Sequence, residues 1–427
     1  MDMVSQLVSQ RPNFFANRAA DQEKAIAITD FIYMSPGLSN AYMVLTSAGR
    51  VVINTGMGFE SPVHKKVFDA VCPGPTPYIL LTQGHVDHVG GVGLFREPQT
   101  KLVAQRNLGI CQEDDRRIKA VRQAQSSIWF KSALTRAAQG ETEARPEFVQ
   151  DVPVADIVFD DHHRLEVGET SFELYSTPGG ETIDSCVVWL PRHRILFSGN
   201  VFGPLFPHFP NFNTIRGDKY RWAEPYLASL QRVRALAPEM LITGHFAPIV
   251  GANLIKACLD RLEAAVDFVH RETLNGMNSG KDIWTLMREV RLPPELHVGE
   301  GYGKVSWAVR TFWEEYMGWF KAEDTSELYP TQPRDVYPDL VELAGVDAVV
   351  ERGRRKLTEG NPEAALLLAE AALAADRDHR ESLKLARDTH QVLLDRSGAV
   401  NFWETGWLRH RIDRLDAALK VARGGTG

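Results

Sequence analysis

The stretch Leu80-Leu81-Thr82-Gln83-Gly84-His85-Val86-Asp87-His88-Val89-Gly90-Gly91 joins an apolar run to two imidazoles and a carboxylate. The apolar residues up to Thr82 predict a buried strand, and His85, Asp87 and His88 follow it within one short loop. Divalent metals of borderline softness favour imidazole and carboxylate ligands. Glycines on both sides permit the tight backbone path that brings such side chains together. The stretch therefore predicts a metal-binding loop at a strand end, in preference to a polar surface loop.

Eight short runs of strand-forming residues precede residue 255 and surround this loop. They predict strands over residues 41–46, 51–54, 78–82, 102–104, 171–176, 183–190, 195–197 and 240–243. The first two flank Ser47-Ala48-Gly49-Arg50, which predicts a hairpin. Helical spacing of apolar residues appears at 61–71 and 219–236. Strands mixed with single helices predict an α/β sandwich.

Residues 108–150 have the character of a helical insertion. The segment 114–138 is compatible with a helix, carries several basic residues, and has an apolar patch at Ile128, Trp129 and Phe130. A solvated surface helix explains this pattern more simply, and an amphipathic flap over a site is the alternative.

After residue 255 the apolar spacing is that of amphipathic helices. Pro330, Pro333 and Pro338 mark a linker between two helical stretches. Within 346–394, Gly360 and Pro362 fit a helix stop and restart, which predicts a hairpin of tetratricopeptide type. Because one such hairpin cannot bury its apolar face alone, we expect it to pack on a neighbour or on a second subunit.

Composition narrows the class of protein. The chain has 427 residues and a formal charge of −7, without a basic tract, which argues against nucleic acid as the main partner. No apolar run approaches the length of a membrane span, and the N-terminus lacks the apolar core of a secretory signal. The four cysteines form no Cys-x-x-Cys pair, so we expect reduced thiols and a cytoplasmic protein.

Four further motifs give the metal loop a family context. The loop resembles the His-x-His-x-Asp-His signature of the metallo-β-lactamase superfamily, and the order of the other motifs agrees. Asn54-Thr55-Gly56 is similar to the family's Asp-Thr-Gly turn, and Thr177-Pro178-Gly179-Gly180-Glu181 to its Thr-Pro-Gly loop. Phe197-Ser198-Gly199-Asn200 and Ile242-Thr243-Gly244-His245 resemble its later strand ends. The resemblance implies an αββα sandwich.

Other residues narrow the resemblance to the alkylsulfatase branch. Glu181 falls on the position of that branch's glutamate ligand, and Thr214-Ile215-Arg216-Gly217 resembles its sulfate-binding run. Tyr302-Gly303-Lys304-Val305-Ser306 and Tyr316-Met317-Gly318-Trp319-Phe320 are similar to the start of its helical dimerisation domain. The resemblance implies a sandwich domain over 1–255, an all-α dimerisation domain over 256–427, a homodimer and a small-molecule substrate.

Two positions depart from the family pattern. Gln83 stands where the first histidine is expected, and Asn200 where a bridging carboxylate is expected. The resemblance implies two metal positions, whose ligand sets are Gln83, His85 and Glu181 for the first, and Asp87, His88 and His245 for the second, with residue 200 between them. An amide oxygen is a weaker ligand than an imidazole, and Asn200 removes a charge that would hold two cations together. We therefore predict one tight Zn²⁺ at the second position and a weak or absent ion at the first. Two histidines and one carboxylate suit Fe²⁺ as well, and Mn²⁺ is a further alternative.

The function predicted from these motifs is metal-assisted hydrolysis of an ester or sulfate ester by an activated water. Asp87 is the predicted catalytic residue at the metal, and Arg216 is expected to hold the acid group of the substrate. Asn211 and Tyr302 complete the substrate site by analogy. Two alternatives stay open, a mononuclear non-haem iron enzyme with oxidative chemistry and a non-catalytic binding protein with a degenerate site.

The aromatic stretch near residue 205 allows two interpretations. Phe202, Phe206, Phe209 and Phe212 could line an apolar pocket, but core packing is the preferred prediction. His208 lies in the same stretch, and we expect a solvated loop histidine there.

Overall fold

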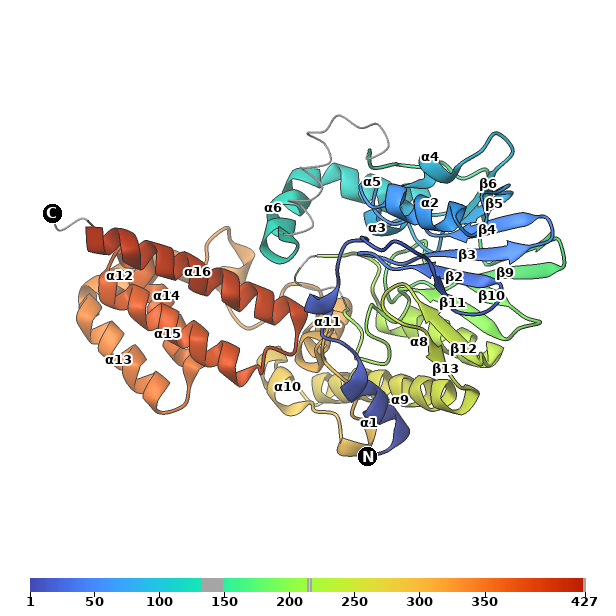
Figure 1. Cartoon of the computed structure of the whole chain (residues 1–427). Coiled ribbons are helices and arrows are strands. Elements are labelled where there is room, and N and C mark those ends of the chain that lie inside the picture. The colour runs from blue at the N-terminus through green and yellow to red at the C-terminus, as the bar shows by residue number, and fades with distance from the viewer. Residues whose placement is uncertain (132–148, 213–214, 216, 425–427) are drawn as a thin grey trace. The chain divides into compact units, whose positions relative to one another are not determined.

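The computed structural model describes residues 1–131, 149–212, 215 and 217–424, and its first compact unit contains two β-sheets (Figure 1). The strands of the first sheet lie in sequence order: β1 (Ile26–Ala27), β2 (Ile32–Ser35), β3 (Ala41–Thr46), β4 (Gly49–Ile53), β5 (Tyr78–Leu80), β6 (Lys101–Gln105) and β7 (Ile157–Phe159). The second sheet has the order β13 (Ile249–Val250), β12 (Met240–Thr243), β11 (Ile195–Gly199), β10 (Cys186–Leu190), β9 (Thr170–Ser176) and β8 (His162–Val167). The predicted strands and the hairpin of β3 and β4 are confirmed.

The alternation of side chains along the strands explains why the sheets stack. In β4, Val51 and Ile53 belong to the apolar core between the two sheets, where they join Val188 and Phe197 of the second sheet. Val52, which points to the other face of β4, belongs to a separate core with the helices outside the first sheet. Both faces of the first sheet are thus covered.

Helices form the two outer layers (Figure 1). The first sheet is accompanied by α2 (Ser61–Asp69), α3 (Val86–Val89) and α4 (Val92–Phe95). The second sheet packs on α8 (Ala223–Leu236) and α9 (Ala252–Asn278), and the same core includes residues of α1 (Met3–Gln10), α10 (Ile283–Glu289), η3 (Pro294–Leu296) and α11 (Val305–Met317). The predicted αββα sandwich is confirmed.

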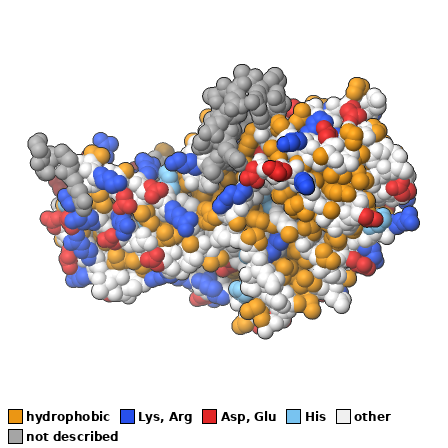
Figure 2. Space-filling model, viewed as in Figure 1, with side chains coloured by type: hydrophobic (Ala, Val, Ile, Leu, Met, Phe, Trp, Pro, Cys, Tyr) orange, Lys and Arg blue, Asp and Glu red, His pale blue; other side chains and the backbone are white. Residues whose placement is uncertain are grey.

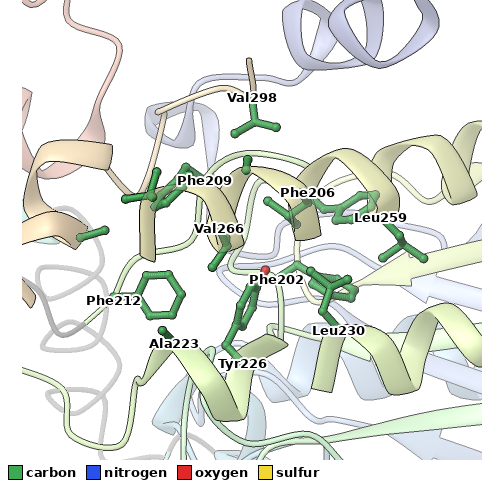
Figure 3. Close-up of a cluster of buried hydrophobic side chains, with 14 of the residues drawn as sticks. Phe202, Phe206, Phe209, Phe212, Ala223, Tyr226, Leu230, Leu259, Val266 and Val298 are labelled. Atoms are coloured by element: carbon green, nitrogen blue, oxygen red, sulfur yellow. The ribbon is translucent and has the colours of Figure 1, made fainter. Parts of the chain in front are cut away.

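The phenylalanine-rich stretch after β11 lies in this second core. Phe202, Phe206, Phe209 and Phe212 are buried against Tyr226 of α8 and apolar residues of α9 (Figure 3). The prediction of core packing is confirmed, but the prediction of a solvated His208 is wrong. His208 is buried, and its Nδ1 accepts a hydrogen bond from the Gly301 amide at 3.0 Å. Its ring fits there because Gly299 and Gly301 of the facing segment have no Cβ atoms that would collide with it.

The insertion begins with two short helices instead of one continuous helix. They are α5 (Leu108–Arg117) and α6 (Lys119–Trp129), which meet at Ile118, and residues 132–148 lie outside the described part of the chain. Asp114 of α5 accepts a hydrogen bond from Lys219 at 2.9 Å. The insertion is therefore tied by an ion pair to the segment that leads into α8.

Residues 316–427 form the second compact unit. Its helices are η4 (Thr325–Leu328), η5 (Pro333–Val336), α12 (Tyr337–Ala344), α13 (Val346–Thr358), α14 (Pro362–Ala375), α15 (Arg380–Arg396) and α16 (Phe402–Gly424). The predicted hairpin is confirmed, since α13 ends before Gly360, which has a φ of 78°, and Asn361 caps α14. Its apolar face packs on α15 and α16 of the same chain.

The compact units divide the chain later than the predicted boundary at residue 255. The physical reason is the apolar face of α9, whose Leu259, Leu262 and Val266 pack into the core of the first unit. The family boundary at residue 255 stays a prediction.

Three further observations bear on the class of protein. Among the described residues, no helix combines the length and the apolar character needed to cross a membrane. The four cysteines are free thiols, and three of them are buried. Basic and acidic side chains are interspersed over the visible face of the molecule (Figure 2).

Candidate metal centre

The predicted metal loop leaves the first sheet at the carboxyl end of β5. Thr82 is held there by Asn54, whose side chain accepts the Thr82 amide proton at 3.0 Å and donates to the Thr82 hydroxyl at 2.9 Å. His85 then begins the single turn of α3, which carries Asp87 and His88. The tie between the ends of β4 and β5 therefore fixes the start of the loop.

Three predicted ligands converge on one point. One ligand atom from each of Asp87, His88 and His245 lies within 4.8 Å of the other two. His245 follows β12, so that each sheet contributes to the cluster. This spacing is that of side chains that can share one cation, and the donor set suits Zn²⁺, Fe²⁺ or Mn²⁺.

Burial and charge hold these groups in the protonation state of metal ligands. Burial lowers the pKa of His245 to about 4 and also lowers that of His88, so both imidazoles are neutral near pH 7. Burial acts to raise the pKa of Asp87, but the neighbouring histidines His88, His245 and His85 outweigh it and leave the value below normal. Neutral imidazoles and an ionised carboxylate are the forms that bind metal.

Asn200 lies between the two histidines, as the motif order implied. Its Nδ2 is 3.0 Å from Nε2 of His88 and 3.1 Å from Nε2 of His245. Its Oδ1 is buried and has no hydrogen-bond partner among the described residues. Where a bridging carboxylate would bring a negative charge, this chain brings a neutral amide.

The residues of the predicted first metal position, Gln83, His85 and Glu181, also lie close together. Arg221 is an additional residue beside them. Nδ1 of His85 lies 3.8 Å from Oε2 of Glu181 and 3.1 Å from Nε2 of Gln83. Oε2 of Glu181 also accepts a hydrogen bond from the guanidinium of Arg221, which is only 2% exposed. A carboxylate paired with a buried arginine and a neutral amide do not fit a second divalent cation well.

A cavity of about 190 Å³ opens beside the cluster. Its polar lining includes members of both ligand sets and Arg221. Its other lining residues come from distant segments: Phe14, Asn17, Leu38, Met57, Val86, Ser126, Phe130, Pro204 and Tyr302. The rings of Phe14 and Tyr302 meet edge to face at 5.0 Å, and Phe14 also contacts the His245 ring at 5.5 Å. Ser126 and Phe130 belong to the insertion, which favours the flap interpretation over a solvated helix.

The predicted substrate residues have different outcomes. Tyr302 lines the cavity. Asn211 is buried, and its carbonyl accepts a hydrogen bond from Nη1 of Arg221 at 3.0 Å, so it borders the site through its backbone. Arg216 lies outside the described residues, and its role stays a prediction.

Sequence reasoning missed two residues of this site. The sequence contains a partial indication of Arg221, since this residue lies in the same segment as the predicted Arg216. The sequence contains no indication of Phe14, because this residue lies in η1 (Phe14–Ala16), a single turn in a segment without any recognisable motif.

Two protein families match the chain. Residues 34–245 match the metallo-beta-lactamase superfamily, and residues 283–403 match the alkyl sulfatase dimerisation family. Together these segments cover most of the chain. Residues 34–245 therefore form a domain of the metallo-beta-lactamase superfamily. The resemblance to its alkylsulfatase branch, with the helical dimerisation domain, is thereby confirmed.

Curated relatives support the same branch. A linear primary-alkylsulfatase of a Pseudomonas strain is 25% identical over 411 residues, which are 89% of this chain and 76% of the relative. An alkyl/aryl-sulfatase of Saccharomyces cerevisiae is 23% identical over 393 residues, which are 86% of this chain and 60% of the relative. The chain is thus similar to two proteins named as sulfatases and spans part of the length of each.

Solved structures agree in fold. A double mutant of the sec-alkyl sulfatase PisA1 matches with a TM-score of 0.79 and 19% identity, over 97% of this chain and 70% of that one. The stereoselective inverting sec-alkylsulfatase Pisa1 from Pseudomonas sp. matches with a TM-score of 0.77 and 18% identity, over 94% and 66%. At these identities the likeness shows the shared fold.

Proposed function

We propose that the protein hydrolyses sulfate esters of small apolar alcohols, with one Zn²⁺ held by Asp87, His88 and His245. The observation that carries the proposal is the convergence of these three side chains beside a largely apolar cavity. The relatives named alkylsulfatase supply the substrate class.

The metal and the protein have separate tasks in this proposal. A bound zinc ion would supply a Lewis acid and a nucleophilic water of lowered pKa. Asp87 supplies the negative charge at the metal position, and His88 and His245 supply neutral nitrogen atoms there. Arg216 and Tyr302 are proposed to orient the substrate, Arg216 through the sulfate group and Tyr302 through the wall of the cavity.

The cavity limits which alcohol part the substrate can carry. Leu38, Met57, Phe130 and Phe14 give apolar surface on several sides. A volume of about 190 Å³ accommodates a short alkyl chain or a single ring. We therefore favour short-chain or aryl sulfates over long-chain detergents.

The finer assignments belong to the same proposal. Zinc is preferred over Fe²⁺ and Mn²⁺ because the relatives are hydrolases, and nothing favours the oxidative or the non-catalytic alternative. The match to the alkyl sulfatase dimerisation family supports a homodimer. A cytoplasmic location is proposed from the free thiols.

The test is a substrate panel with the zinc-loaded protein. Hexyl sulfate and a phenyl sulfate are offered beside dodecyl sulfate and the corresponding carboxylic esters, and sulfate release is measured by ion chromatography. The proposal expects release from the two smaller sulfates. Hydrolysis of the carboxylic esters alone would overturn the substrate class, and dioxygen consumption with iron would favour the oxidative alternative.

A further inference from the structure

Arg221 is a buried cation in the wall of the cavity. Its Nη2 donates to Oε2 of Glu181 and, at 2.8 Å, to Oδ2 of Asp218. Its Nη1 donates to the carbonyl of Asn211 at 3.0 Å. A buried guanidinium needs such partners, because an unpaired charge in the interior is strongly destabilising. Two carboxylates and one carbonyl pair its two terminal nitrogens, while its buried Nε has no hydrogen-bond partner among the described residues.

The same contacts occupy the carboxylate that a second metal would require. Oε2 of Glu181 is the atom that faces His85, at 3.8 Å, and it is also the atom bound to Arg221. A divalent cation between His85 and Glu181 would therefore lie against a positive guanidinium in a poorly solvated place. Repulsion between like charges is strong there because little water screens it.

The remaining groups cannot compensate for this repulsion. Gln83 and Asn200 are neutral amides, and the Nδ2 group of Asn200 is directed at His88 and His245. Glu181 is thus the one carboxylate of the predicted first ligand set, and Arg221 already balances its charge. The other metal position keeps Asp87, which the described contacts do not pair with an arginine or a lysine.

A further ion pair holds this arrangement in place. Asp218, the second partner of Arg221, also pairs with Arg122 of α6 at 3.0 Å between Oδ1 and Nη2. The row Glu181, Arg221, Asp218, Arg122 therefore alternates in charge from the cavity to the insertion. Arg221 cannot turn away from Glu181 without leaving a charge in this row unbalanced.

We propose that the guanidinium of Arg221 takes the place of a second metal ion, so that each chain binds a single divalent ion at Asp87, His88 and His245. The proposal rests on the proposed function for the metal site itself, and it replaces the weak ion expected near His85 and Glu181 by a fixed positive charge. Such a charge differs from a metal in one testable respect, since chelators do not remove it.

Metal stoichiometry tests the proposal. The full-length protein is stripped with a chelator, loaded with Zn²⁺, gel-filtered, and analysed by inductively coupled plasma mass spectrometry. Wild type is expected to retain one ion per chain. The variant Gln83→His with Asn200→Asp restores an imidazole and a carboxylate but keeps Arg221, and it is also expected to retain one ion. Addition of Arg221→Met is expected to raise the number to two.

A charge-matched control separates the charge of Arg221 from its size. Arg221→Lys in the same background keeps the cation and is expected to leave one ion per chain. Electron paramagnetic resonance spectra of the Mn²⁺-loaded proteins add a second measurement. Two neighbouring Mn²⁺ ions give a spin-coupled signal, and a single ion does not. Two ions in wild type, or in the variant that keeps Arg221, would overturn the proposal, and so would one ion in the folded Arg221→Met variant.

The metal content of the other variants still tests the proposal if the Arg221→Met variant does not fold. The variant Gln83→His with Asn200→Asp then decides, since one ion supports the proposal and two ions contradict it. Failure of the proposed function has a different signature, namely one retained ion without sulfate release.

Discussion

The hydroxyl oxygen of Ser39 lies 3.1 Å from Nδ1 of His88 and 3.4 Å from Nε2 of the same ring. Nε2 of His88 lies 3.0 Å from Nδ2 of Asn200, and a metal held by Nε2 would leave the ring proton on Nδ1, the nitrogen nearer to Ser39. Ser39 also donates to the carbonyl of Gly244 at 3.3 Å, next to His245. One buried hydroxyl thus contacts both the ring of one predicted metal ligand and the backbone beside another.

Ser39→Ala is expected to weaken zinc binding by roughly 10- to 100-fold, because the His88 ring loses the acceptor that orients it. Competition with a chromogenic chelator measures the affinity. Ser279→Ala, at the exposed position that follows α9, is the control and is expected to bind zinc as wild type does. An unchanged affinity in Ser39→Ala would show that Ser39 does not orient the ligand.

Phe14→Ala is expected to raise KM for a phenyl sulfate several-fold with a smaller effect on kcat. The reason is that Phe14 contributes a wall of the cavity and contacts both Tyr302 and His245. Removal of a buried ring also lowers the free energy of unfolding by roughly 3 kcal/mol, which denaturant titration measures. Phe15→Ala is the matched control, since Phe15 is half-buried and does not line the cavity. Equal KM values in the two variants would contradict a role of Phe14 in substrate binding.

The stability of the fold is expected to fall in mild acid. Burial lowers the pKa of His208 from 6.5 to about 4, so the unfolded chain binds a proton more readily than the folded protein does. The free energy of unfolding is therefore unaffected by this group above pH 6.5 and decreases as the pH falls toward 4, by about 2 kcal/mol at pH 5. Denaturant titrations at pH 7 and pH 5 measure the difference.

His208→Gln keeps a hydrogen-bond acceptor for Gly301 and removes the titrating ring. The variant is expected to lose less stability between pH 7 and pH 5 than wild type does, whatever its stability at pH 7. His193→Gln, at an exposed position, is expected to show the pH dependence of wild type. A wild-type slope in His208→Gln would assign the acid sensitivity to other groups.

The second compact unit is expected to mediate a homodimer. Tyr329, Leu340 and Leu343 are exposed on or near α12, and Leu343 has 86% of its surface accessible. Apolar side chains of this kind are normally covered in an assembly. Light scattering at micromolar concentration is expected to give twice the mass of one chain. The mass of a monomer would contradict the assignment.

The sequence predicted the sandwich well because its strands carry strong local patterns. Val51 to Ile53 and Ile79 to Leu81 are continuous apolar runs, and the glycines beside His85 and His88 mark the loop between a strand and a helix. Strands β1, β2, β7, β8 and β13 were not predicted. Of these, β1 and β13 have two residues each, too few for a periodic pattern, and β8 is polar on its outer face.

Only the part of the site that lies in sequence motifs was predicted. His85, Asp87, His88, Glu181 and His245 each follow a motif at a strand end, so their convergence could be expected from the family resemblance. A residue that reaches the site by a tertiary contact has no such signal. Arg221 binds Glu181, which lies 40 residues earlier in the sequence. Phe14, near the N-terminus, contacts the ring of His245.

Asp87, His88 and His245 are proposed to hold the ion that hydrolysis requires, and zinc content measured together with sulfate release tests this assignment. Wild type and Asp87→Ala are compared with Asp160→Ala, which removes an exposed carboxylate that pairs with Arg106. Wild type and Asp160→Ala are expected to retain one zinc per chain and to release sulfate from hexyl sulfate, whereas Asp87→Ala is expected to do neither. A wild-type protein without stoichiometric metal, or an Asp87→Ala variant that still releases sulfate, would contradict the assignment of these three residues to the metal site.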